Sequence, residues 1–321
     1  MTMRELAKLA NVSVSTVSKA FSGADDVRED TKNYIFEVAK KYGCFGKFYK
    51  DKFSKKVIAI ICSELISNYY SSFVEKLQNY IESNGGIAVI SADHFNRTKQ
   101  AELIEYYASY LKVDGIIVFD LKSTIKKGYD IPIVALFSSV DENIDLVKLN
   151  IHNALKESIE LLYGLGHRNV AFIGESFTKL RAKHFVELVS KYDGMTPYVY
   201  ESSYRFEKAG QDGVKQILKE KVDCTAFFCA YDNIAIGSIK QLKKIGFTVP
   251  DDYSVIGINN ITTAEYMQTS LTTIDSNSDE ICAIAWDLLQ KKQSNKYYSS
   301  NKEVIIKCRL IVRESVGKAS R

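Results

Sequence analysis

Residues 1–21 constrain the fold of this chain more than any other stretch, because they predict two short helices joined by a tight turn. Thr2 and Glu5 have the spacing of a capping box, in which each side chain bonds the backbone of the other residue at a helix start. Ser13 can cap the second helix. The residues expected to recur on the inward faces at helical spacing are Leu6, Leu9, Ala10, Val17 and Phe21.

The outward face of the second helix is predicted to carry small, polar or basic side chains. Such side chains approach the edges of DNA bases without a bulky clash. They are Val14, Ser15, Ser18 and Lys19. The pattern favours a helix-turn-helix with an exposed DNA-reading face, and the alternative is a helical pair that merely packs against another part of the chain.

The charge distribution supports DNA binding by the N-terminal part. Residues 1–56 contain 12 Lys and Arg against 7 Asp and Glu, whereas the whole chain has a net charge of only +4. The excess positive charge therefore lies where phosphate contacts would need it. Residues 43–56 combine glycine, lysine and aromatic residues, which predicts a solvated, flexible tether.

From residue 57 onward, short β-branched runs alternate with amphipathic stretches. The runs VIAIIC, GIAVIS, VDGIIVFD and IPIVALF predict one set of strands, and NVAFIG, PYVYES, TAFFCA and YSVIGIN predict a second set. Helices are expected between them, including residues 178–192, 206–219 and 232–245. This alternation predicts two successive α/β halves, each with a parallel sheet that is covered on both faces.

The stretch LAKLANVSVSTVSKAFSG resembles the DNA-binding head of the LacI/GalR family of bacterial transcription regulators. The matching residues are Val12, Ser13, Thr16, Val17, Ser18 and Lys19, followed by Val27, Thr31 and Lys32 at a third helix. In that helix, Ile35, Val38, Ala39 and Tyr42 form an apolar stripe. The body is similar to the effector domain of the same family at ISNYY, VDGIIV, LGHRNVAFIG, VPDDYSVIGINN, SLTTI and LIVRES.

The resemblance implies an all-α helix-turn-helix head followed by an α/β, two-lobed domain of the periplasmic-binding-protein-like type I fold. The expected boundaries are 1–46 for the head, 47–56 for a hinge and 57–316 for the ligand-binding and dimerisation domain. Lobe 1 would contain residues 57–165 and 275–300, and lobe 2 residues 166–274 and 301–316. The chain would cross between the lobes near Gly166, Ile274 and Asn301.

The resemblance also implies the contacts to DNA. Ser15, Ser18 and Lys19 would read bases and Val14 would contact a thymine methyl group, with Thr16 in the same motif. The lysines of the linker, Lys50 among them, would grip phosphate. Phe53 falls at the place of the leucine that the family inserts into the minor groove, although the family's Tyr-x-Pro-Asn entry to the hinge is missing here.

Effector-binding residues are expected after the strands, because ligands bind at the carboxyl ends of strands in doubly wound sheets. Arg181 falls where the family keeps a ligand-binding arginine, and the alternative is a surface arginine on a helix. Several of the family's acidic and amide residues are replaced here, so we expect a less acidic and more aromatic pocket. The full predicted set is Asn68, Tyr70, Ser71, Phe137, Asn150, Phe177, Arg181, Tyr231, Asp232 and Asn259.

Nothing in the sequence supports catalysis. GLGHRN lacks the third glycine of a dinucleotide-binding fingerprint, no GxxxxGK[ST] occurs, and the four histidines show no metal-ligand spacing. The six scattered cysteines predict buried thiols in a reducing compartment. No apolar run is long enough to span a bilayer, and the start of the chain has no apolar signal core. We therefore expect a cytoplasmic protein with no cofactor, no metal and no membrane partner.

The sequence thus predicts a transcription regulator, with repression favoured, that binds a near-palindromic operator as a homodimer. A small-molecule effector, a sugar or related metabolite, would bind between the lobes. One alternative is a DNA-binding regulator controlled by a protein partner or by no ligand. Another is a solute-binding module whose head has become an interaction domain, and the charge excess of the head argues against it.

Overall fold

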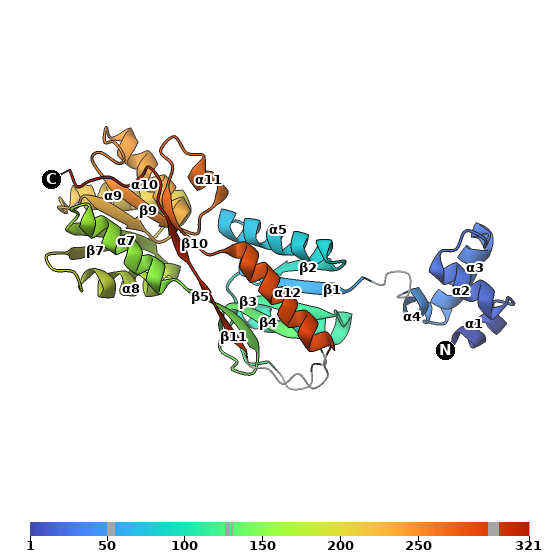
Figure 1. Cartoon of the computed structure of the whole chain (residues 1–321). Coiled ribbons are helices and arrows are strands. Elements are labelled where there is room, and N and C mark those ends of the chain that lie inside the picture. Colours follow the sequence, from blue (N-terminus) through green and yellow to red (C-terminus); the bar gives the residue numbers. More distant parts are fainter. Residues whose placement is uncertain (50–54, 126–128, 130, 295–301, 321) are drawn as a thin grey trace. The chain divides into compact units, whose positions relative to one another are not determined.

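The structure is a computed structural model that describes residues 1–49, 55–125, 129, 131–294 and 302–320. The chain divides into two compact units, Met1–Lys56 and Val57–Arg321 (Figure 1). The first unit is helical. The second contains two lobes, each built on its own sheet. The predicted fold class is confirmed by this architecture.

The head consists of four helices, α1 (Met3–Leu9), α2 (Val14–Ser22), α3 (Glu29–Lys41) and α4 (Phe45–Tyr49). The predicted capping box is present, because the Thr2 backbone N–H donates to Glu5 Oε2 at 2.7 Å and the Glu5 N–H donates to Thr2 Oγ1 at 3.3 Å. Ser13 Oγ accepts from the Thr16 N–H at 2.9 Å and so begins α2 as expected. The left-handed Gly23 ends that helix.

The aromatic core of the head extends into the stretch expected to be a tether. Cys44 and Phe48 are buried, and α4 packs its rings against Phe21 of α2. The predicted boundary at residue 46 therefore lies two residues before Phe48, the last side chain of the head that the structure describes as buried. Leu9 and Tyr42, which were expected to face inward, are 43% and 49% exposed.

Lobe 1 is built on a six-stranded parallel sheet with the order β11-β5-β4-β3-β1-β2. One face packs against α5 and α12, and the other against α6 and the π-helix η2. Successive residues of β1 alternate between these two cores, so the strand is apolar on both sides. The elements are β1 (Val57–Cys62), α5 (Asn68–Ser83), β2 (Ile87–Ala92), α6 (Arg97–Glu105), η2 (Tyr106–Leu111), β3 (Gly115–Leu121), β4 (Ile133–Ser139), β5 (Asp145–Asn150), α12 (Ser278–Ser294) and β11 (Glu303–Lys307).

Lobe 2 has a sheet of the order β12-β10-β9-β8-β6-β7, parallel except that β12 runs antiparallel to β10. Its large core joins the sheet to α7, α8, α9 and α10. The elements are α7 (His152–Gly164), β6 (Asn169–Glu175), η3 (Ser176–Thr178), α8 (Lys179–Val189), β7 (Thr196–Ser202), α9 (Phe206–Lys219), β8 (Ala226–Cys229), α10 (Asp232–Lys244), β9 (Ser254–Ile258), α11 (Thr262–Glu265), β10 (Thr272–Asp275) and β12 (Arg309–Ile311).

The chain crosses between the lobes three times, and two of the predicted crossings were wrong. The first lies at Ile151 and not near Gly166, because the buried residues of α7 belong to the core of lobe 2. The third lies at Cys308 and not near Asn301, because β11 adds to the lobe 1 sheet beside β5. The second, between β10 and α12, lies close to the predicted Ile274. The first and third crossings can be followed in Figure 1 from β5 to α7 and from β11 onward.

Candidate DNA-binding face and interlobe cleft

The helix α2 presents the predicted DNA-reading residues together. Val14, Ser15, Ser18 and Lys19 are all exposed, while Val17 and Phe21 on the opposite side are buried. Thr16 lies at the edge of this face, with its Oγ1 only 2.7 Å from Ser13 Oγ at the helix start. Lys50 and Phe53 fall outside the described residues.

Two further cations lie beside this face and were missed from the sequence. Arg4 and Lys8 of α1 line a groove with Val14, in the corner between the two helices. Both are exposed, so they can reach phosphate while α2 reaches base edges. Lys19 forms an ion pair with Asp26, and because both groups are about half exposed, this pair costs little to exchange for DNA.

Between the lobes, the ends of the strands carry a concentration of unusual backbone conformations. Among the described non-glycine residues, positive φ angles occur after or near the ends of six strands. These residues are His94 and Phe95 after β2, Asp120 in β3, Phe137 in β4, Phe206 after β7, Asn259 and Asn260 after β9, and Asn277 after β10. Left-handed backbone at such residues costs free energy and tends to cluster at binding sites.

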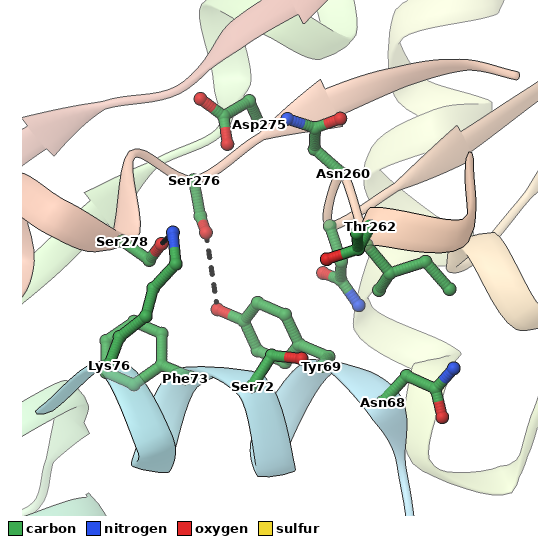
Figure 2. A pocket seen from close by; sticks show the side chains of 12 residues that line it. Asn68, Tyr69, Ser72, Phe73, Lys76, Asn260, Thr262, Asp275, Ser276 and Ser278 are labelled. Carbon is green, nitrogen blue, oxygen red and sulfur yellow. Dashed lines mark hydrogen bonds between the residues drawn. The ribbon is translucent and has the colours of Figure 1, made fainter. Parts of the chain in front are cut away.

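A small pocket of about 80 Å³ lies where the two lobes meet, beside the second crossing of the chain. The three crossings form the hinge between the lobes, which is distinct from the hinge expected at residues 47–56. Helix α5 of lobe 1 forms its floor, and the β9–α11 loop and the second crossing of the chain face it (Figure 2). The Tyr69 hydroxyl points from α5 across the pocket and donates to Ser276 Oγ at 3.5 Å. Asn68 and Asn259, both predicted to bind effector, line this pocket.

The cleft-facing end of lobe 1 is aromatic. Tyr69, Tyr70 and Phe137 pack against one another and against Phe73 and Phe119, with ring centroids 5.3–6.3 Å apart. Burial raises the pKa of Tyr69 to about 12, so its hydroxyl stays protonated and available as a donor. The arrangement offers ring faces and neutral hydroxyl groups to a ligand.

Arg181 on α8 is partly buried and its Nη1 donates to the Ala230 carbonyl at 2.6 Å. Within the described residues, no ion pair is formed by this guanidinium. Across the cleft, burial raises the pKa of Asp120, and the bond from Ser138 and the charges of Lys122 and Arg181 oppose that rise. The hydrogen bond to Ala230 fixes the position of the Arg181 guanidinium. It uses only one of the five N–H donors of that group, so others can bind a ligand in the cleft.

Asp232 was predicted to bind effector, but the structure places it in the core. Its side chain is completely buried in lobe 2, where Oδ1 accepts from Thr273 Oγ1 at 2.5 Å and Oδ2 accepts from the Ile261 N–H at 2.8 Å. Both oxygens are used in tying α10 to β10 and to the loop before α11. Asp232 thus stabilises the wall of the cleft and is not available to a ligand in this structure.

Burial raises the pKa of Asp232 to about 7, which predicts a pH-dependent contribution to stability. A raised pKa means that the folded state favours the protonated form. The protonated Asp232 side chain therefore contributes fully to the unfolding free energy below the pKa of Asp in the unfolded state, about 4. This contribution is lost as the pH rises to the folded-state pKa of about 7. We expect the unfolding free energy of the wild type relative to Asp232→Asn to fall by about 3 kcal/mol between pH 4 and 7. Urea titrations across that range measure it, and a difference that does not change with pH would contradict the assignment.

The other predicted effector residues fall into two groups. Phe137, Phe177 and Asn259 lie at the strand ends that face the cleft, and Tyr70 lies in the first turn of α5 beside Phe95. In contrast, Ser71 Oγ donates to the Ser67 carbonyl within α5, Asn150 Oδ1 accepts from the His152 N–H, and Tyr231 is buried with its hydroxyl near Glu175. These three are occupied by hydrogen bonds to other residues of the chain.

Several cleft residues were missed from the sequence. Tyr69, Glu64, Phe95 and Arg205 all follow strands β1, β2 or β7. The rule that ligands meet the carboxyl ends of strands would have found Phe95 and Arg205 if it had been applied to β2 and β7 as well, whereas Glu64 and Tyr69 follow β1, where the rule was applied and other residues were chosen. Within the described residues, no group of His, Cys, Asp and Glu side chains is placed to hold a metal ion, and no helix is long and apolar enough to cross a membrane.

Two protein families match this chain. The family of bacterial regulatory proteins, lacI family, matches residues 2–43, and the family of periplasmic binding protein-like domains matches residues 159–316. The HTH-type transcriptional repressor CytR of Escherichia coli (strain K12) is 25% identical over 330 residues, which cover 98% of this chain and 96% of CytR.

Solved structures share the fold over most of the chain. The lac repressor dimer bound to operator and the anti-inducer ONPF superposes with a TM-score of 0.74 at 18% identity, covering 99% of both chains. A periplasmic binding protein/LacI transcriptional regulator from Alkaliphilus metalliredigens QYMF, complexed with D-xylulofuranose, superposes with a TM-score of 0.72 at 22% identity, covering 82% of this chain and 99% of that one. The head, the two lobes and both family matches agree, and the chain belongs to the LacI family of bacterial regulatory proteins, which are DNA-binding transcription regulators and not enzymes.

Proposed function

We propose that this protein is a repressor that binds a near-palindromic operator as a homodimer and is controlled by a small-molecule effector, a sugar or related metabolite, in the interlobe cleft. Two heads related by a two-fold axis would reach half-sites about 10 bp apart or slightly more. The lac repressor, which shares this fold, is a dimer on its operator, and this supports the same assembly here.

The exposed face of α2 supports operator recognition. Ser15 and Ser18 carry hydroxyl groups that donate or accept at base edges, and Lys19 adds a cation that can reach guanine or phosphate. The cations of α1, Arg4 and Lys8, flank the same face. Affinity for DNA should therefore fall steeply with salt, because each phosphate contact releases a counterion.

The observation that carries the effector proposal is the convergence of strand ends from both lobes on one polar and aromatic cleft. The pocket at the hinge has amide groups at Asn68, Asn259 and Asn260 and hydroxyl groups at Tyr69 and Ser276. Amides and hydroxyls pair with sugar hydroxyls, and the rings beside them can stack on a sugar ring. The structural relative complexed with D-xylulofuranose supports this class of ligand.

Substitution of Arg181 tests the effector site. We expect Arg181→Ala to lower effector affinity about 10- to 100-fold while operator affinity without effector is unchanged, because hydrogen bonds to a charged donor are strong. The effector is found first by a thermal-shift screen with sugars, nucleosides and phosphorylated metabolites, since a ligand that binds only the folded state raises the melting temperature. Titration calorimetry with the best compound then compares the effector affinity of the wild type with that of Arg181→Ala.

Arg168 supplies the matched control. It is also an arginine of lobe 2 that donates to a backbone carbonyl, but it is exposed and precedes β6, at the other end of the sheet from the cleft. Arg168→Ala should bind effector like the wild type. An Arg181→Ala protein that binds the effector like the wild type and shows the same effector-dependent change in operator binding would contradict the assignment of this site.

A further inference from the structure

An ion pair joins the two lobes at the mouth of the cleft. Arg205, which follows β7 in lobe 2, donates from both Nη atoms to the two carboxylate oxygens of Glu64, which follows β1 in lobe 1, each at 2.9 Å. The Glu64 carboxylate is 6% exposed and the Arg205 side chain 33% exposed. A two-pronged, partly buried pair of this kind is stronger than an ordinary surface ion pair.

Aromatic rings surround this pair and also join the lobes. Phe95 of lobe 1 and Phe177 of lobe 2 stack with their centroids 4.7 Å apart and their planes 17° apart. The Arg205 guanidinium lies 5.7 Å from the Phe95 centroid, 5.2 Å from that of Phe177 and 4.5 Å from that of Phe206. Phe177 is 59% exposed, so its ring adds little to the core of lobe 2, and the ring stacked on it belongs to the other lobe.

The position of these contacts follows from the order of the strands. The three crossings of the chain use β5, β10, β11 and β12, which lie at one edge of the two sheets. Glu64, Phe95, Phe177 and Arg205 follow β1, β2, β6 and β7, which lie at the opposite edge. Contacts far from the hinge separate most when the lobes open, so contacts at this edge restrain opening most strongly.

The charges of lobe 2 place Arg205 for this contact. Glu175 Oε1 lies 3.9 Å from Arg205 Nε, and Glu175 is itself held by the Phe177 N–H. Arg205 Nε has no hydrogen-bond partner among the described residues. The guanidinium therefore donates its two strong hydrogen bonds to Glu64 of the other lobe. That carboxylate is the main cause of the raised pKa of Arg205.

We propose that Glu64, Phe95, Phe177 and Arg205 form a clasp, built from the chain's own residues, that holds the two lobes closed at the edge opposite the hinge. This clasp makes closure a property of the protein before any effector binds. Where the cleft takes an effector, as proposed above, entry requires the clasp to open, and the free energy of the clasp is subtracted from that of effector binding.

The test measures lobe closure in the full chain with no ligand added. Spin labels are attached at Glu102→Cys on α6 and Lys215→Cys on α9, two exposed sites, because the native cysteines are all buried. Pulsed dipolar spectroscopy on labelled protein diluted with unlabelled protein gives the distance distribution within one chain. We expect one dominant short distance in the wild type, and in Glu64→Gln about a tenfold rise in the ratio of long to short distances.

Further variants keep the proposal open to refutation. Arg205→Met should give at least the same shift, because it also removes the guanidinium from the rings of Phe95 and Phe177. Glu64→Gln added to Arg205→Met should shift no further, because the two residues act as one pair. Phe177→Ser, at an exposed position, should also increase the long distance. Glu201→Gln is the matched control, since the Lys179–Glu201 pair lies within lobe 2 and should not affect closure.

Two results would overturn the clasp. One is a distance distribution unchanged in Glu64→Gln, Arg205→Met and Phe177→Ser, and the other is an equal shift in Glu201→Gln. Because no effector is present, the outcome is independent of the effector screen. A clasp that opens as expected together with a failed screen would refute only the effector, and the reverse would refute only the clasp.

Discussion

Replacing Phe21 by Ala should abolish DNA binding and leave the two-lobed body folded. Phe21 is 1% exposed, and its ring lies 5.0 Å from Phe36, 5.8 Å from Phe45 and 5.6 Å from Phe48 between centroids. Removing a buried phenyl ring costs about 3–5 kcal/mol, through lost burial and the cavity that remains. A head of this size is only marginally stable, so this loss is enough to unfold it.

Fluorescence anisotropy on operator DNA and calorimetric melting check this expectation together. The Phe21→Ala protein should lose operator affinity by more than 100-fold, about 3 kcal/mol, while the melting transition of the body is unchanged, since the two units are separate. Tyr34→Ala is the control, because Tyr34 is 51% exposed on α3 of the same head. Normal operator binding by Phe21→Ala would contradict the described core.

Replacing Gly237 by Ala should strongly destabilise lobe 2. Helices α9 and α10 touch through their backbones, and a Cβ added at Gly237 would lie 2.0 Å from the Glu207 carbonyl oxygen. The contact is reciprocal, because a Cβ at Gly210 would lie 2.0 Å from the Ile234 carbonyl oxygen. Backbone cannot move aside as a side chain can, so we expect a loss of about 3 kcal/mol, at the upper end for overpacked cores.

Gly164→Ala provides the comparison at another helical glycine. A Cβ at Gly164, the last residue of α7, meets nothing within 4 Å, so the change should be neutral or slightly stabilising. Urea unfolding of both variants measures the difference. If Gly237→Ala were as stable as Gly164→Ala, the close packing of α9 on α10 would be wrong.

The head was predictable from the sequence because its signals are local. Thr2 with Glu5 and Ser13 with Thr16 satisfy each other within one turn of helix, so residue type and spacing are enough. The packing of α4 (Phe45–Tyr49) into the head was not predictable in this way. Phe48 joins the head only because Phe21 and Phe36, brought from two other helices, form a surface for it, and lysines around it favoured a tether.

In the body, the strands and the two lobes followed from the alternation of apolar runs, but the crossings did not. The run of Glu303–Lys307 is apolar enough for a strand in either lobe, and only its pairing with β5 assigns it to lobe 1. Likewise, α7 has an ordinary amphipathic pattern, and which sheet it covers depends on long-range packing. Pairing of distant strands is not encoded in local spacing.

The structure places the predicted cleft residues in different surroundings. The exchange of acidic residues for aromatic ones predicted a more aromatic pocket, and in the structure Phe137 packs against Phe73 and Phe119 of the lobe 1 core. The role of Asp232 was not predictable, because a carboxylate after a strand could face either the ligand or the core. The pairing of Glu64 with Arg205 joins residues 141 positions apart and has no local signal at all.

Selection of DNA fragments by the purified full chain tests the central claim most directly. The protein is mixed with fragmented genomic DNA of its source over a range of salt concentrations, and the bound fragments are sequenced. The account predicts enrichment of a short, near-palindromic sequence with half-sites about 10 bp apart or slightly more, and binding that weakens steeply with salt. A protein that enriches no sequence even at low ionic strength would contradict it.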